Sequence, residues 1–105
     1  MILSTTETVP GREILQIVGL PRGNVIRAKH IGSDLVAALR SLVGGEISEY
    51  TKLLAEAREQ ALDRMIKDAM SLNADAVVNV RFATSMVMSG AAEILVYGTA
   101  VRLRG

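Results

Sequence analysis

The sequence predicts a single α+β domain in which a small antiparallel sheet packs against one short and one long helix. Three observations lead to this fold class. The chain has 105 residues, half of them hydrophobic, which suffices for one core but not for two. Apolar residues in the middle of the chain recur every three or four positions, as on one side of a helix. Near both ends β-branched and apolar residues follow strand patterns.

The first quarter of the chain is predicted to form strands. Residues 2–5 can form a short strand, and Pro10-Gly11 then provides a turn, because proline fixes φ and glycine accepts a positive φ. Residues 13–26 are rich in β-branched and apolar residues, which favour a strand. Three residues interrupt them: Gly19, Pro21 and Gly23. We interpret residues 13–26 as one long strand broken by a bulge or a tight bend.

Two helices are predicted next. Ser33 is a good N-cap for a short helix that Gly44-Gly45 ends. The long helix begins near Ser48 and has the strongest periodicity in the chain, with a length of roughly 35–40 Å at 1.5 Å per residue. Its apolar side is formed by Ile47, Tyr50, Leu54, Ala57, Ala61, Met65, Ala69 and Leu72, and its other side is charged. Asn73 suits a left-handed C-cap.

The last quarter is predicted to form two strands, so the elements follow one another as β-β-α-α-β-β. Residues 76–83 alternate like a half-buried strand, Ser89-Gly90 can turn, and residues 93–103 are apolar on both faces. Helices cover only one face of a small sheet, so the second face of this strand needs a partner. We assign the interface of a homo-oligomer to Ile94, Val96, Gly98 and Ala100, and expect Val96→Asp to break assembly. Alternatively, the N-terminal strand or a loop covers this surface.

Composition argues against several classes of function. Twelve Lys and Arg against eleven Asp and Glu leave a net charge of +1, too balanced for a nucleic-acid partner. The absence of cysteine excludes disulfides, thiolate metal sites and a cysteine nucleophile. The N-terminus has no signal-peptide pattern, and no apolar run is long enough to span a membrane. We therefore expect a cytoplasmic protein without a membrane or nucleic-acid partner.

Few residues suggest a chemical site, and no catalytic set is predicted. His30 is the only histidine, so a two-histidine metal site would need several copies of the chain around a symmetry axis. Met86 and Met88 could offer two thioethers to a soft metal, with Asp75 as a further ligand. Each has an ordinary structural explanation, as cap, gap-filler or surface residue. Arg81, Arg102 and Arg104 could pair with acids of a neighbouring subunit or remain solvated.

The chain resembles the YbjQ-like family, whose members carry a heavy-metal-binding label. The similarity spans nearly the whole chain. The matching residues are Gly19 and Gly23, Gly44-Gly45 followed by Tyr50, Ala57-Arg58 and Ala61, Ala74-Asp75-Ala76-Val77-Val78, and Gly98-Thr99-Ala100-Val101. The resemblance implies a dodecin-like subunit and assembly into a pentameric ring. It implies no reaction. Arg81 and Ala83 stand where many relatives carry acids, which removes oxygen ligands and adds a charge that repels cations.

Three functional hypotheses remain open. The first is a cytoplasmic, ring-forming homo-oligomer, pentameric by the resemblance, that serves as a binding or scaffolding protein without a bound cofactor. The second is a metal or small-ligand site between subunits, with His30, Asp75, Met86 and Met88 as candidates. The third is a small enzyme with a site between subunits near Glu46, Glu49 and Tyr50, although no nucleophile, base and oxyanion donor can be assigned together.

Overall fold

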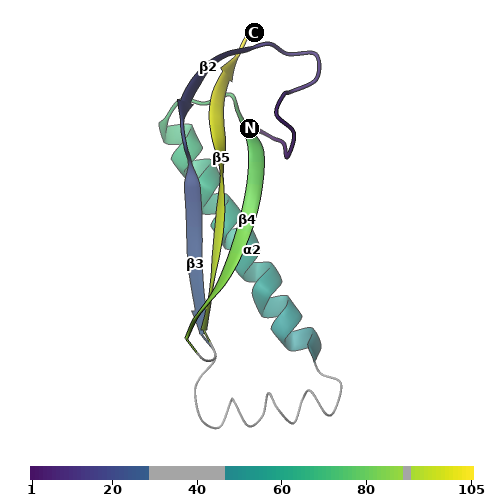
Figure 1. Ribbon diagram of the computed structural model, residues 1–105, viewed down its shortest axis with the longest axis vertical. Helices are drawn as coiled ribbons and strands as arrows, with labels where there is room; N and C mark the ends of the chain where they lie inside the picture. The colour runs from purple at the N-terminus through teal and green to yellow at the C-terminus, as the bar shows by residue number, and fades with distance from the viewer. Residues whose placement is uncertain (29–46, 89–90) are drawn as a thin grey trace.

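The computed structural model describes residues 1–28, 47–88 and 91–105. In chain order the elements are β1 (Ile2–Leu3), β2 (Ile14–Gly19), β3 (Arg22–Ala28), α2 (Ile47–Ser71), β4 (Ala76–Met88) and β5 (Ala91–Leu103). Figure 1 shows one sheet with α2 along one side of it. The α+β class is confirmed. The predicted short helix from Ser33 to Gly44-Gly45 and the Ser89-Gly90 turn lie outside the described residues.

β5 is the central strand of the sheet. β4 pairs with one side of β5, and β2 and β3 follow one another along its other side, all antiparallel. The predicted strand with a break is therefore confirmed as two elements that share one neighbour, with the break at Leu20 and Pro21. Because the broken strand counts twice, three strands precede α2 in place of the predicted two.

β1 makes the sheet mixed, so the prediction of a purely antiparallel sheet is wrong at this strand. Ile2 and Leu3 lie parallel to Ala76 and Val77 of β4, and the N–H of Ser4 donates to the carbonyl oxygen of Val77 at 2.9 Å. A two-residue strand contains too little alternation for its sequence to indicate a direction.

The segment between β1 and β2 covers one end of the sheet on the face away from α2. Its Pro10-Gly11 turn is confirmed: the N–H of Arg12 donates to the carbonyl oxygen of Val9 at 3.0 Å, and Gly11 has a φ of 78°. Val9 is buried in a small apolar cluster. The other members of this cluster are Ile14, Ala76, Val78, Val101 and Leu103.

α2 packs on β3 and β5 through a buried row of three alanines and one methionine. Ala57, Ala61, Met65 and Ala69 are fully buried at four-residue spacing, which places them on one side of the helix. The short side chains of the three alanines let the helix backbone approach the sheet closely. At Gly23 the approach leaves no room for a side chain, since an added Cβ would lie 2.1 Å from the carbonyl oxygen of Ala61.

α2 ends in a Schellman motif at the residue predicted for it. Asn73 has a φ of 57°, and its N–H donates to the carbonyl oxygen of Met70 at 3.0 Å, while that of Ala74 donates to Ala69 at 3.2 Å. These are the two hydrogen bonds of that motif. The prediction of a left-handed cap at Asn73 is therefore confirmed.

The outer side of α2 is charged, as predicted. Its exposed residues include Lys52, Glu56, Glu59, Asp63 and Lys67. No helix in the described part of the chain is long and apolar enough to cross a lipid bilayer.

The predicted interface residues lie in the core instead. Ile94, Val96 and Ala100 are at most 2% exposed and pack in the same cluster as the buried row of α2. A Cβ on Gly98 would meet the Val77 side chain at 2.6 Å. The assignment of these four residues to a surface between subunits is therefore corrected: α2 already covers this face within one chain. On the other face of β5, Tyr97 remains 44% exposed.

Candidate functional site: the uncovered edge of β4

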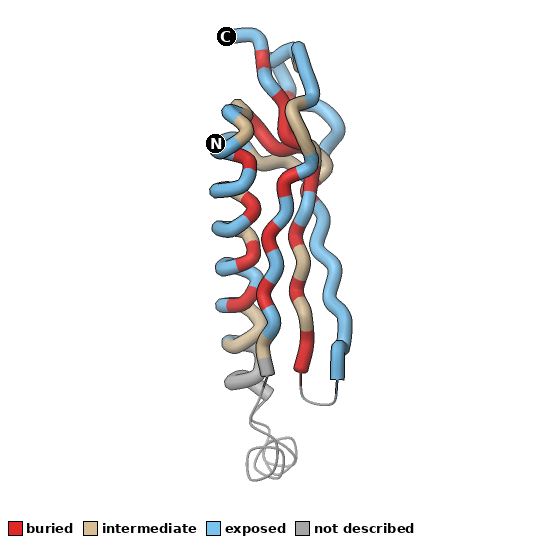
Figure 2. Tube along the Cα trace, turned by 90° about the vertical axis from the view of Figure 1, so that its left-hand side faces the viewer, coloured by how far each residue is buried: buried red, intermediate tan, exposed pale blue. Residues whose placement is uncertain are grey.

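The second half of β4 is the largest exposed apolar strand segment among the described residues. Its first half is mostly buried, but all eight residues from Arg81 to Met88 are exposed. Figure 2 shows this half-strand exposed along its whole length, at the edge of the sheet that lies farthest from α2. β1 pairs only with Ala76 and Val77, so no described strand lies on the outer side of β4 beyond Val80. We call residues Arg81–Met88 the β4 edge.

The β4 edge is apolar and almost uncharged. Phe82, Met86, Val87 and Met88 are exposed, and Arg81 is its only charged residue. Phe82 and Met86 lie opposite Val96 and Ala92, so they project to the helix side of the sheet. There α2 packs mainly on β3 and β5, and these two side chains remain exposed. Soluble monomers rarely leave a long uncharged strand edge open, because such an edge pairs readily with other chains.

A bulge separates the buried half of β4 from the β4 edge. The pairing with β5 shifts register between Val78 and Arg81, and Asn79 there has a φ of 53°. The N–H of Asn79 donates to the carbonyl oxygen of Thr6 at 3.0 Å, and Nη1 of Arg81 donates to that of Thr5 at 2.9 Å. The N-terminal segment therefore protects β4 up to the bulge and no further.

A second exposed apolar segment lies across the sheet, on β2. Leu15, Ile17 and Leu20 are all more than half exposed, with Ile17 at 65% and Leu20 at 76%. β2 pairs with β5 alone among the described strands, so its outer side is open as well. We call residues Ile14–Leu20 the β2 edge. Sequence reasoning predicted this strand but missed its exposure; the signal was the absence of any charge between Ile14 and Leu20.

Of the candidate metal ligands, the structure describes Asp75, Met86 and Met88, and it places Asp75 far from the two methionines. Asp75 precedes β4, and Met86 and Met88 lie at its other end. Asp75 is therefore separated from the two methionines by roughly 35–45 Å at about 3.3 Å per residue. His30 lies outside the described residues. Among the described residues, no three His, Cys, Asp or Glu side chains are grouped closely enough to hold a metal ion. Asp75, Met86 and Met88 therefore do not form a heavy-metal site within one chain, because such a site needs several soft or imidazole ligands close together.

Asp75 has a structural partner. Its Oδ2 accepts a hydrogen bond from the N–H of Leu103 at 2.8 Å, and its own N–H donates to the carbonyl oxygen of Val101 at 2.9 Å. Asp75 thereby fastens the last residues of β5 to the start of β4. The three arginines also have partners in their own chain: Arg81 at Thr5, Arg102 at the carbonyl oxygen of Asn73, and Arg104 at the carboxylate of Glu13.

Asp75→Ala should lower the free energy of unfolding by about 1–3 kcal/mol, because it leaves the buried N–H of Leu103 without its charged acceptor. Urea titration followed by circular dichroism measures the loss. Asp75→Asn keeps an oxygen acceptor and should lose less. The matched control is Asp63→Ala on the exposed side of α2, expected within about 0.5 kcal/mol of the parent chain. Equal losses for Asp75→Ala and Asp63→Ala would contradict the role assigned to Asp75.

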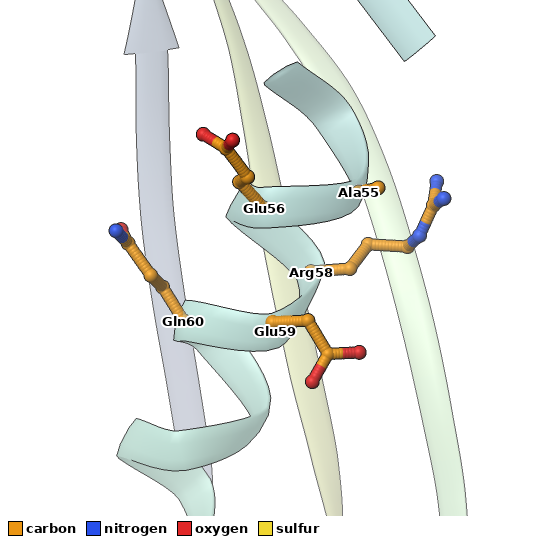
Figure 3. A pocket seen from close by; sticks show the side chains of 5 residues that line it. All are labelled: Ala55, Glu56, Arg58, Glu59 and Gln60. Carbon is orange, nitrogen blue, oxygen red and sulfur yellow. The ribbon is translucent and has the colours of Figure 1, made fainter. Parts of the chain in front are cut away.

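The residues of the enzyme hypothesis do not form a described site. Glu46 lies outside the described residues, and Glu49 and Tyr50 lie in the first turn of α2. Further along α2 an open hollow is lined by Ala55, Glu56, Arg58, Glu59 and Gln60. In Figure 3, Glu56 and Gln60 point to one side of the helix and Arg58 to the other. These five residues converge on no common point where a reaction could occur, so the enzyme hypothesis stays a prediction.

Comparison with known proteins agrees with the resemblance seen in the sequence. The model of the YbjQ_1 family, described as "Putative heavy-metal-binding", matches residues 1–104. A UPF0145 protein of Archaeoglobus fulgidus is 62% identical over 104 residues, covering 99% of this chain and 96% of its own. UPF0145 proteins of Methanosarcina acetivorans and Vibrio campbellii are 60% and 58% identical over 103 residues, covering 98% of this chain and 97% and 99% of their own.

A solved structure shares the fold. It is a crystal structure of a Pediococcus pentosaceus protein of unknown function from the DUF74 family, with a TM-score of 0.69 and 16% identity over 99% of this chain and 98% of that one. At this identity the likeness concerns the fold alone, and the likeness to dodecin stays a prediction. The family match over nearly the whole chain and the relatives at about 60% identity agree with one another. The chain therefore belongs to the YbjQ_1 family of UPF0145 proteins.

Proposed function

We propose that the protein is a subunit of a closed homo-oligomer, a ring of five by the family resemblance, that serves in the cytoplasm as a binding or scaffolding protein. The observation that carries this proposal is the β4 edge, eight consecutive exposed residues with a single charge. Burying an exposed Phe or Met side chain contributes about 1.5–3 kcal/mol, so covering Phe82, Met86 and Met88 favours association.

The proposal differs from the sequence prediction in where the contact lies. α2 covers the face of β5 that carries Ile94 and Val96. The apolar surface that remains exposed therefore lies on the strands beside β5. A second copy of the chain is the partner that is always present at a matching concentration. A closed arrangement also limits growth, which open edges otherwise permit.

Native mass spectrometry of the untagged protein tests the proposal. We expect one species of several subunits, five by the resemblance, at micromolar concentration. Light scattering in low and high salt should give the same mass, because apolar burial is not screened by ions. A uniform monomer of 11.2 kDa under both conditions would refute the proposal.

A metal or small-ligand site between subunits is the second candidate function. Met86 and Met88 favour it, because both thioethers are exposed on the β4 edge, and symmetry would bring several copies near one another. Thioethers select soft cations such as Cu(I). Elemental analysis of untagged protein should find at least one such ion per ring, and the Met86→Leu, Met88→Leu double variant should lose it while keeping the apolar surface. Much less than one ion per ring in the parent protein excludes the metal site.

A further inference from the structure

Within the proposed homo-oligomer, on which this step rests, we infer that the β4 edge of one copy contacts the β2 edge of the next. The contact is head-to-tail, and each copy contributes two different surfaces to the assembly.

The first reason is the placement of the two edges. β4 and β2 lie on opposite sides of β5, and both have an outer side without a described neighbour. A symmetric contact would pair the β4 edges of two copies with each other. It would leave Leu15, Ile17 and Leu20 exposed in both copies. A head-to-tail contact covers both edges with a single kind of interface, and repeating it around an axis closes a ring.

The second reason is the size of one contact. The β4 edge is about 27 Å long at 3.4 Å per residue, and one sheet layer is about 10 Å thick. Their product, on the order of 270 Å², is about a third of the ~800 Å² that each partner of a stable complex buries. One such contact is too small for a stable pair, whereas a ring gives each subunit two.

The third reason is the chemistry of the two edges. The β2 edge has no charge and the β4 edge only Arg81. Their contact therefore buries no other acid or base, and Arg81 already donates to the carbonyl oxygen of Thr5. The pairing of β2 with β5 has two register shifts, which makes its outer side irregular. The contact therefore consists of packed side chains rather than a continuous ladder of backbone hydrogen bonds.

The β4 edge and the β2 edge lie at different positions along β5, and this offset is compatible with a closed ring. The β4 edge lies beside the first half of β5, and the β2 edge lies beside its last residues. Each copy is therefore displaced along the strand direction relative to its neighbour. A fixed displacement of this kind is compatible with a closed ring when the strands tilt, as in a barrel.

Cysteine cross-linking tests the pairing, because the chain has no cysteine of its own. Thr84→Cys marks the middle of the β4 edge and Ile17→Cys marks the β2 edge; both positions are exposed. Each variant is treated with a short bismaleimide at a concentration where the parent chain is oligomeric. We expect each single variant to stay one chain on a denaturing gel. An equimolar, reassembled mixture should give covalent dimers, and the double variant a ladder that ends at the subunit number of the ring.

Met70→Cys is the matched control, since Met70 is 60% exposed on α2 and belongs to neither edge; it should cross-link with neither variant. Cross-linking of Thr84→Cys or Ile17→Cys alone would show a symmetric contact and overturn the inference. No cross-link in the mixture, with the parent chain oligomeric, would also overturn it while leaving the proposed function standing. A monomeric parent chain would instead refute the proposed function, and the inference with it.

Discussion

Val96→Asp is expected to unfold the chain rather than to divide an oligomer into folded monomers. Val96 is 0% exposed and packs in the cluster that joins β5 to α2. An ionised carboxylate there has no partner and no water, and the cost exceeds about 4 kcal/mol, a large share of the ~5–15 kcal/mol that stabilises a domain. The loss should be seen as a collapse of the circular dichroism signal and of amide dispersion in NMR spectra.

The adjacent residue supplies the control. Tyr97 lies on the opposite face of β5 and is 44% exposed, so Tyr97→Asp should leave a folded chain. Val96→Ala leaves a measurable native state and should cost roughly 2–3 kcal/mol, because it removes buried methyl groups and leaves a cavity. A folded, monomeric Val96→Asp protein would restore the earlier assignment of Val96 to a surface between subunits.

Gly23→Ala should destabilise the chain by about 3 kcal/mol or more. The new methyl carbon would lie 2.1 Å from the carbonyl oxygen of Ala61 and 2.5 Å from the nitrogen of Met65. Both atoms belong to the backbone of α2, so no rotamer change relieves the contact, and the whole helix must move away from β3. Urea unfolding at equilibrium measures the change in free energy.

Gly11→Ala separates this clash from backbone strain. Gly11 has a φ of 78° but nothing within 4 Å of an added Cβ, so alanine there should cost only about 1 kcal/mol or slightly more, from the left-handed backbone alone. If Gly23→Ala lowered the free energy of unfolding no more than Gly11→Ala, α2 would lie farther from β3 than in this structure.

The local elements could be predicted from the sequence because their signals are local. The apolar residues from Ile47 to Leu72 recur at helical spacing over seven turns, and the observed helix, Ile47–Ser71, follows them. Asn73 ends the helix as expected, because a left-handed cap depends on one residue type at one position. The broken strand was also visible, since Gly19, Pro21 and Gly23 interrupt an otherwise β-branched stretch.

The partner of each face could not be predicted in the same way. Alternation along β5 shows that both faces are apolar, but Ile94 and Leu95 give the same signal whichever layer covers them. The choice depended on α2, whose Ala57, Ala61 and Ala69 make the narrow contact surface that fits over β3 and β5. Because α2 packs mainly on β3 and β5, the second half of β4 stays exposed. The pattern of a single strand does not show how far the helix reaches across the sheet.

The order in which the strands are synthesised has a consequence for folding in the cell. β1, β2 and β3 occupy residues 2–28, but their sheet partners lie between residues 76 and 103. On the ribosome these first strands emerge with no sheet partner until β4 and β5 have been synthesised. Such long-range pairing slows folding. The uncharged stretch from Ile14 to Leu20 is thus the segment of the nascent chain in greatest need of protection from aggregation.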